Sequence, residues 1–180
     1  MKKIVTLGFV AAMAAGVASQ DAPQPPKPTK EHEWLQQLVG EWDSEGEAVL
    51  EPGKPPIKTK GSESGRSLGG FWIQCENKGD FLGTPFTGLL TIGYDVDRKK
   101  YVGTWVDSMT SVLWKYEGAV DATGKILTLE TEGPADVPGK LAKFREAIEV
   151  KSKDHKVFRS EIEKDGKWIT HLTMNYHRKK

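Results

Sequence analysis

The sequence predicts a single antiparallel up-and-down β-barrel of about ten strands, preceded by one short helix. Short runs of alternating apolar and polar residues recur at a spacing of roughly 8–12 residues, which is typical of a sandwich or barrel. Turn-forming sequences separate these runs. No long helical segment lies between them, and this excludes a parallel sheet with crossover helices. The chain therefore belongs to the all-β class.

The N-terminus has the pattern of a secretory signal peptide. Lys2 and Lys3 form a basic start, residues 4–17 are mostly apolar, and small residues lead to a cleavage site after Ser19. The apolar run is shorter than the roughly 20 residues needed to span a bilayer. We therefore expect residues 1–19 to be removed, the mature chain to have no transmembrane segment, and the protein to be periplasmic or secreted.

A short linker and a helix follow the signal peptide. Residues 20–30 are rich in proline, which predicts a stiff, extended tether. In the segment 31–40 the apolar side chains fall on one helical face, and Gly40 is a natural helix stop. Residues 31–180 are expected to form one lipocalin-like barrel domain, with this helix at its start.

The alternation then predicts ten strands. They are expected at 41–50, 57–68, 70–77, 86–94, 100–108, 111–120, 125–132, 141–151, 156–163 and 167–178.

Hairpin parity predicts which side chains share a face, because side chains alternate along a strand. A turn at residues 109–110 places Trp105 beside Trp114, Gly103 beside Tyr116 and Asp107 beside Val112. The preceding hairpin adds Leu90, Ile92 and Tyr94 to the same face. The following hairpin places Gly118 opposite Leu127 and, on the outer face, Lys115 opposite Glu130. One face is thus apolar and aromatic, and the other is charged.

Two later strands are less determined. A two-residue turn at Asp165-Gly166 separates Phe158 and Trp168 onto opposite faces, whereas a bulge at Gly166 brings both inside. We take the bulge, which turns Arg178 inward and turns His171 and His177 outward. In strand 141–151, either the set Phe144, Glu146 and Ile148 or the set Leu141, Arg145 and Ala147 faces inward, and we favour the first set.

Charge and thiol content exclude some functions. The chain has 26 basic and 25 acidic side chains, and loss of Lys2 and Lys3 leaves a net charge of −1. Nucleic-acid binding depends on clustered Lys and Arg, so no nucleic-acid partner is expected. Cys75 is the single cysteine and lies in an alternating apolar run, so we expect a buried structural thiol.

Two short segments together resemble the signature of one known family. The first strand begins Gly40-Glu41-Trp42 directly after a helical turn, and the last strand ends Tyr176-His177-Arg178. This resembles the lipocalin (calycin) signature, in which a tryptophan closes the barrel and a late arginine packs on it. The resemblance implies a barrel closure made by Trp42 and Arg178, with the guanidinium within about 6 Å of the indole ring.

A closer similarity covers nearly all of residues 30–179. It is carried by the runs EHEWLQQLVGEW, RSLGGFW (66–72), IGYDVDRKKYVGTWVDSM (92–109), EGP (132–134) and the closing NYHR. These runs resemble the bacterial family named domain of unknown function 1579 (DUF1579), which implies a lipocalin-like fold. The family has no established catalytic or binding residues, so the resemblance implies no site.

Other motifs do not support a cofactor or metal. The sequence GSESG (61–65) has Glu63 where a nucleophile elbow needs serine. The run Asp95-Val96-Asp97 is followed by Lys99 where a calcium loop needs an oxygen ligand. His171 and His177 are about 20 Å apart along one strand and cannot share a metal ion. We therefore expect no metal and no cofactor.

The predicted inner face supplies the candidate site. Its members are Tyr94, Tyr101, Trp105, Asp107, Trp114 and Tyr116. Aromatic walls with a few polar groups are typical of a pocket for a small apolar or amphipathic molecule. Asp107 is interpreted as a ligand anchor or a general base, or alternatively as a cap of the 108–111 turn. Binding of such a ligand is the leading hypothesis. The alternatives are a barrel enzyme, an isomerase or hydrolase with Asp107 as base, and a filled barrel that contacts envelope proteins.

Overall fold

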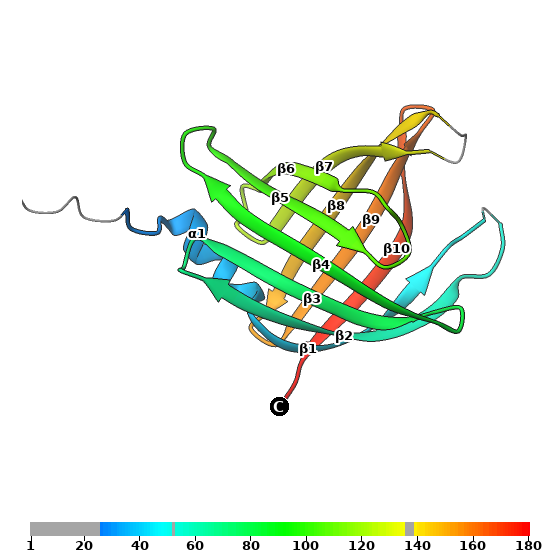
Figure 1. The fold of residues 1–180 in the computed structure, drawn as a ribbon, viewed down its shortest axis with the longest axis horizontal. Coiled ribbons are helices and arrows are strands. Elements are labelled where there is room, and N and C mark those ends of the chain that lie inside the picture. The colour runs from blue at the N-terminus through cyan, green and yellow to red at the C-terminus, as the bar shows by residue number, and fades with distance from the viewer. Residues whose placement is uncertain (1–25, 52, 136–138) are drawn as a thin grey trace, which may run out of the picture.

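The protein is a closed ten-stranded antiparallel barrel in which neighbours in the sequence are neighbours in the sheet (Figure 1). The computed structural model describes residues 26–51, 53–135 and 139–180. The predicted signal peptide and residues 20–25 of the predicted linker lie outside the described residues. Pairing of the first strand with the last closes the barrel, and this confirms the predicted fold class. The strands are β1 (Gly40–Ala48), β2 (Ile57–Leu68), β3 (Trp72–Phe81), β4 (Thr84–Asp95), β5 (Lys100–Asp107), β6 (Trp114–Val120), β7 (Ile126–Pro134), β8 (Leu141–Ser152), β9 (His155–Lys164) and β10 (Lys167–Arg178).

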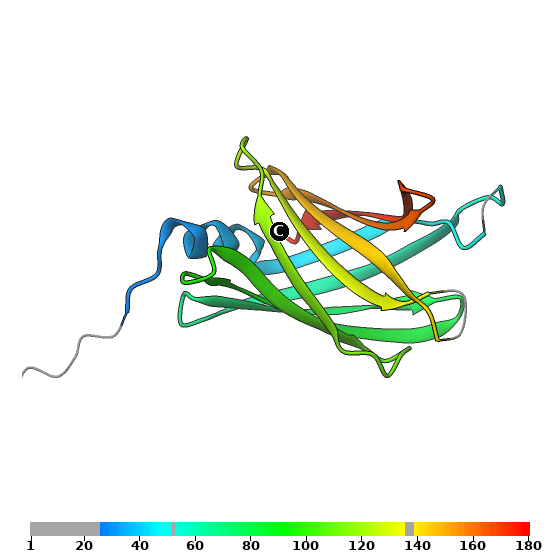
Figure 2. The same cartoon turned by 90° about the horizontal axis from the view of Figure 1, so that it is seen from above.

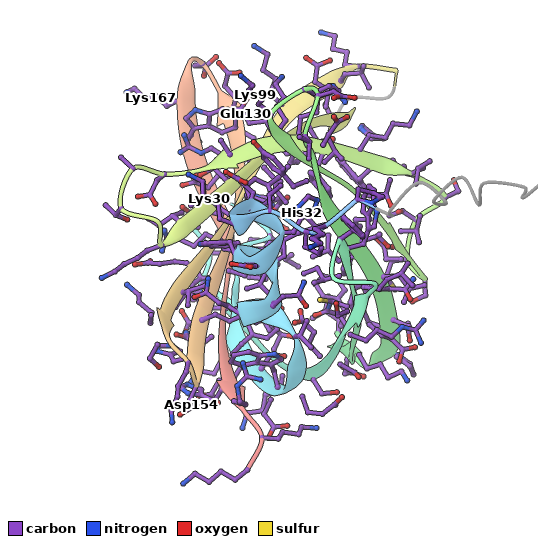
Figure 3. All side chains as sticks on the ribbon, turned by 90° about the vertical axis from the view of Figure 1, so that its left-hand side faces the viewer. Lys30, His32, Lys99, Glu130, Asp154 and Lys167 are labelled. Atoms are coloured by element: carbon purple, nitrogen blue, oxygen red, sulfur yellow. The ribbon has the colours of Figure 1, made fainter. Side chains whose placement is uncertain are left out.

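A short helical segment lies across one end of the barrel (Figures 1 and 3). The helix α1 (Lys30–Leu35) continues into the 3₁₀ turn η1 (Gln36–Leu38), so the predicted helix over 31–40 begins and ends slightly earlier. Leu35 and Leu38 are fully buried beneath it. Long-range hydrogen bonds hold the segment in place, among them one from Trp34 Nε1 to the Gly124 carbonyl and one from the Tyr101 hydroxyl to the Glu31 carbonyl. No helix among residues 26–51, 53–135 and 139–180 has the length and apolar character to cross a membrane.

At the opposite end of the barrel, the described residues form no helix. The hairpin loops of β1–β2, β3–β4, β5–β6, β7–β8 and β9–β10 gather there, because each odd-numbered strand runs away from α1. Figure 2 shows α1 and the long β1–β2 loop at opposite ends of the molecule. The two ends of the barrel therefore differ: α1 and η1 cover one end, and the described residues at the other end are hairpin loops.

The register confirms the predicted parity of β4, β5 and β6. Trp105 lies opposite both Leu90 and Trp114, and Gly103 lies opposite Tyr116. The predicted pairing of Asp107 with Val112 is wrong, because β5 ends at Asp107 and residues 108–113 form a loop.

The predicted register between β6 and β7 is wrong by two residues. Gly118 lies opposite Leu129, and Glu117, not Lys115, lies opposite Glu130. The observed turn is two residues longer than the predicted one, and the Asp121 carboxylate stabilises it, because Oδ1 accepts hydrogen bonds from the backbone N–H groups of Lys125 and Ile126. A shift of two residues preserves the faces, so the apolar inner surface is unchanged.

The last hairpin corrects another prediction. Asp165 and Gly166 both have positive φ angles, of 52° and 72°, and form a two-residue turn that is typical of hairpins. The bulge lies further along β10, between Thr170 and Leu172. Trp168 therefore faces outward and stacks on the Arg145 guanidinium, whereas His171 turns into the barrel. Both orientations are opposite to the prediction.

Packing is concentrated near α1. The fully buried side chains there include Leu35, Leu38, Ile73, Ile92 and Leu127. Cys75 is buried in the same cluster, as predicted, and burial raises the pKa of its thiol. This core closes the α1 half of the barrel and leaves the other half less filled.

Candidate functional site

The half of the barrel away from α1 contains a cavity of about 550 Å³. All ten strands contribute residues to its lining. This volume lies within the range of about 300–1,000 Å³ that is typical of small-molecule pockets. The barrel interior is therefore hollow on the side of the loops.

Two tryptophans form much of the cavity wall. Trp105 is stacked with Phe86, with ring centres 6.1 Å apart, and Trp114 contacts Phe144 edge to face at 5.1 Å. Two glycines make room for these indoles: a Cβ at Gly88 would overlap the Trp105 ring, and a Cβ at Gly133 would overlap the Trp114 ring. Each indole can thus lie close against the wall and leave the centre of the barrel open.

The six predicted site residues separate into two groups. Trp105, Asp107, Trp114 and Tyr116 line the cavity. Tyr94 and Tyr101 do not belong to its lining and lie beneath α1, where their rings contact each other at 5.0 Å. Strand parity predicts that all six side chains point into the barrel. It does not predict which of them line the cavity and which belong to the packed core near α1.

Asp107 lies at the rim and caps the β5–β6 turn. Its Oδ1 accepts hydrogen bonds from the backbone N–H groups of Met109 and Thr110, at 2.8 and 2.9 Å. Its Oδ2 accepts a hydrogen bond from Nε1 of Trp105 at 2.8 Å. Both oxygens are therefore engaged within the protein, which corresponds to the turn-capping alternative and positions the Trp105 ring.

A buried ion pair lies in the floor of the cavity. Nζ of Lys156 is 2.5 Å from Oε1 of Glu63, and both side chains are about 6% exposed. The ammonium group also lies over the rings of Trp42 and Tyr176, at 4.6 and 5.0 Å from their centres. Aromatic faces and a carboxylate together offset the cost of burying this cation.

A second polar group lies on the wall formed by β8, β9 and β10. Oγ of Ser160 donates to Oε1 of Glu146 at 2.9 Å and lies 3.1 Å from Nε2 of His171. Because a hydroxyl has one proton, Nε2–H of His171 is the donor in the second contact. Oε2 of Glu146 is shielded from solvent and has no hydrogen-bond partner among the described residues. His171, Ser160 and Glu146 thus form a chain of hydrogen bonds, and Oε2 at its end has no partner among the described residues.

Burial dominates the electrostatics of this wall. Desolvation raises the pKa of Glu146 to about 8, the Ser160 hydrogen bond lowers it in part, and the charge of Glu161 raises it further. Burial likewise raises the pKa of Tyr116, with smaller contributions from Glu146 and Asp107. Near neutral pH, Glu146 is therefore mainly in its neutral form when the cavity is empty.

Sequence reasoning did not identify most of these polar residues. Phe158 was placed inside, and alternation along β9 then requires Lys156 and Ser160 to face inward as well. That signal was present in the sequence. No such signal in the sequence indicates that His171 faces inward, because its orientation depends on the bulge between Thr170 and Leu172.

Two arginines that could have paired with an anionic ligand group, Arg66 and Arg145, lie outside the barrel. Arg66 donates to the Gln74 side chain on the surface, and Arg145 is paired with Glu161. The favoured orientation of β8 is confirmed, since Phe144, Glu146 and Ile148 line the cavity. Neither arginine can therefore contact a molecule inside.

The remaining histidines have other roles. His32 is buried beneath α1, where Nε2 lies 3.1 Å from the Tyr94 carbonyl. His155 and His177 stack on each other, with ring centres 4.6 Å apart. Within the described part of the chain, no group of three or more His, Cys, Asp and Glu side chains is placed to hold a metal ion.

The loops at the open end expose several apolar side chains. They are Leu50 in the β1–β2 loop, Leu82 in the β3–β4 loop, Met109 and Leu113 in the β5–β6 loop, and Leu141 at the start of β8. Leu50 and Met109 also line the cavity. An apolar molecule that enters from this end would thus meet apolar side chains before it reaches the interior.

The chain matches one family model and several solved structures. The model described as "Protein of unknown function (DUF1579)" matches residues 27–178. No curated protein matches the chain.

The structural matches concern the fold. The crystal structure of Rv2717c from M. tuberculosis is 16% identical and superimposes with a TM-score of 0.60, over 86% of this chain and 100% of that chain. A redesigned β-barrel, mFAP0, bound to DFHBI is 15% identical with a TM-score of 0.44, over 79% of this chain and 100% of that chain. The first match supports the fold alone, and the second is too distant to bear on the site.

Proposed function

Because the chain belongs to the DUF1579 family of proteins of unknown function, its role has to be inferred from its own geometry, and we propose that it binds a small apolar or amphipathic molecule inside the barrel. The cavity of about 550 Å³ carries this proposal. Its walls are mainly aromatic and aliphatic, and a few polar groups converge on it, which is the composition of small-molecule pockets.

The alternatives from the sequence are less well supported by the geometry. A filled barrel that acts through its outer surface would have no cavity of this size. An enzyme with Asp107 as general base would need a carboxylate oxygen free to accept a substrate proton, and both oxygens are occupied by hydrogen bonds. Ligand binding requires neither a filled barrel nor a free oxygen on Asp107.

Export is a second part of the proposal. It depends on Lys2, Lys3 and the apolar run that follows, all of which lie outside the described residues. If the signal peptide is removed as proposed, the barrel would meet its ligand in the periplasm or outside the cell.

A fluorescent probe tests ligand binding directly. The neutral dye N-phenyl-1-naphthylamine should bind with saturation at about one molecule per chain, and its emission should rise in the apolar cavity. Energy transfer from tryptophan to the bound dye should fall when Trp105 and Trp114 are replaced by phenylalanine. Trp72→Phe is the matched control, because Trp72 lies on the outer face of β3 and is partly exposed.

The result that would overturn the proposal is equally direct. If folded protein shows no saturable uptake of this dye or of other apolar probes, the cavity does not function as a binding site. Equal loss of energy transfer in the Trp72→Phe control would place the dye on the surface.

A further inference from the structure

The charged groups inside the cavity are unevenly balanced. Besides Asp80 in the β3–β4 turn, three carboxyl groups line the cavity: those of Glu63 and Glu146, and that of Asp107 at the rim. Three lysines belong to the described lining, Lys60, Lys78 and Lys156, and of these Lys156 is buried. Carboxyl groups therefore outnumber ammonium groups along the path of a bound ligand.

Lys156 is not available to an anionic ligand. It is paired with Glu63 and enclosed by the rings of Trp42 and Tyr176. A ligand carboxylate that captured this ammonium would leave Glu63 buried without its partner. Breaking one side of a buried pair is strongly unfavourable.

The other lysines of the lining are directed elsewhere. Lys60 lies 4.0 Å from Glu45 and Lys78 lies 2.8 Å from Glu76, and both pairs are exposed to solvent. At the rim, Asp80 accepts a hydrogen bond from the backbone N–H of Gly83 and holds the β3–β4 turn. These residues border the entrance and add no cation to the interior.

Among the described residues, Glu146 is the one carboxyl group of the lining with a solvent-shielded oxygen, Oε2, that has no hydrogen-bond partner. Asp107 is saturated by its turn and Trp105, and Glu63 is paired with Lys156. In Glu146, Oε1 is held by Ser160, whose hydroxyl is oriented by His171, whereas Oε2 has no partner among the described residues. A buried polar atom without a partner is costly, so a ligand that supplies a hydrogen bond here gains that energy.

We infer that the cavity selects amphipathic molecules with a hydrogen-bond-donating head, an amine above all, and that this head donates to Oε2 of Glu146. This inference rests on the proposed binding function and names the class of ligand. A protonated amine would also provide the positive charge that stabilises Glu146 in its ionised form. A carboxylate of the same length would meet three carboxyl groups and no free cation.

The position of Glu146 suits a molecule with a head and an apolar tail. On β8 it lies between Phe144 and Ile148, which also face inward. Phe144 contacts Trp114, and the neighbouring strand β9 places Phe158 on the same inner surface. A tail of about ten carbon atoms could therefore contact aromatic and aliphatic side chains while the head meets Oε2.

Three ligands of equal length test the inference. Decylamine, decanol and decanoate, each below its micelle concentration, compete with N-phenyl-1-naphthylamine at pH 7. We expect decylamine to bind at least 10-fold more tightly than decanoate, with decanol in between. In Glu146→Gln the preference for the amine over the alcohol should fall at least 5-fold.

A control on the outside of the barrel isolates the role of the buried carboxyl group. Glu130→Gln makes the same chemical change at an exposed position of β7, labelled in Figure 3, and should preserve the order of the ligands. Decanoate that binds as tightly as decylamine would overturn the inference and leave the binding function standing. So would an amine preference that survives in Glu146→Gln. If the dye and all three competitors fail to bind, the proposed function itself is wrong.

Discussion

The guanidinium carbon of Arg178 lies 4.0 Å from the centre of the Trp42 ring. The two residues are also opposite each other in the β1–β10 ladder, so this contact joins the first strand of the barrel to the last. The guanidinium donates to the carbonyl groups of Val39, Lys153 and Gln37 as well. The predicted closure contact is thus confirmed, and it also links the barrel to the 3₁₀ turn that covers its end.

The variant Trp42→Ala should therefore have a much lower free energy of unfolding. Trp42 is about 1% exposed, and loss of a buried large aromatic side chain costs about 3–5 kcal/mol. Arg178→Lys should cost less, about 1–3 kcal/mol, because it removes a planar donor group that serves three carbonyls. Urea unfolding followed by tryptophan fluorescence measures both. Arg98→Lys, in an exposed pair with Glu117, is the control and should change the free energy of unfolding by less than about 0.5 kcal/mol.

Gly40 should be irreplaceable for a related reason. Its φ angle is 128°, a conformation that side chains disfavour, and a Cβ there would overlap Nη1 of Arg178. We expect Gly40→Ala to lower the free energy of unfolding by about 2–4 kcal/mol, from backbone strain and loss of the arginine contacts. Gly166→Ala has a positive φ angle but open space around it, and should cost about 1 kcal/mol. Equal losses in the two variants would mean that the Arg178 contact contributes nothing.

These two residues illustrate what the sequence could predict. The expected parity of Arg178 depended on a bulge at Gly166, and it is correct because the bulge between Thr170 and Leu172 adds the same single residue. The pattern Gly40-Glu41-Trp42 predicted the closure independently, because it depends on local order in the chain. The inner aromatic face could be predicted for the same reason. His171 could not be placed, since a bulge adds one residue and reverses the parity beyond it. Glu63 and Lys156 are 93 positions apart in the sequence, and nothing local to either residue reveals that they form an ion pair.

The size of the cavity should depend on the glycines behind the tryptophans. In Gly88→Ala the new methyl group would occupy space now taken by the Trp105 ring, so the indole must move. We expect the dye to bind at least 5-fold more weakly, because the displaced ring would move toward the open interior. The position has no positive φ angle, so the backbone should remain unchanged. Gly124→Ala, in a surface turn with a φ angle of 72° and open space, adds backbone strain without displacing a ring and serves as control. Unchanged binding in Gly88→Ala would indicate that the Trp105 wall does not limit the ligand.

The proposed export predicts the start of the mature protein. Chain purified from its native host should begin near Gln20 and be recovered outside the cytoplasm, because cleavage is expected after Ser19. N-terminal sequencing and cell fractionation provide the measurement. Replacement of an apolar residue in the leader by arginine should cause the uncleaved precursor to accumulate. Recovery of cytoplasmic protein with Met1 intact would contradict the proposal.

Titration of Glu146 should make stability depend on pH. The pKa of this carboxyl group is raised from 4.5 to about 8 in the folded protein, because burial disfavours its charge. Between these two values the folded state holds a proton that the unfolded state has released, so the free energy of unfolding must fall as pH rises. Relaxation of the protein around a buried charge lowers the cost of ionisation, so we expect a loss of about 1–3 kcal/mol from this group, less than the full shift implies. Carboxyl groups with lowered pKa values, such as Glu149, act at lower pH and with the opposite sign.

The variant Glu146→Gln separates this contribution from the others, because it keeps a hydrogen-bond acceptor for Ser160 and cannot ionise. Its free energy of unfolding, relative to the original protein, should rise by about 1–3 kcal/mol between pH 4.5 and pH 8.5. Urea unfolding at four or five pH values in this interval measures the difference, and Glu130→Gln provides the exposed reference. Parallel curves for Glu146→Gln and the original protein would mean that Glu146 is ionised throughout. Such a carboxylate would already be solvated or paired, and Oε2 would not be open to the head of a ligand.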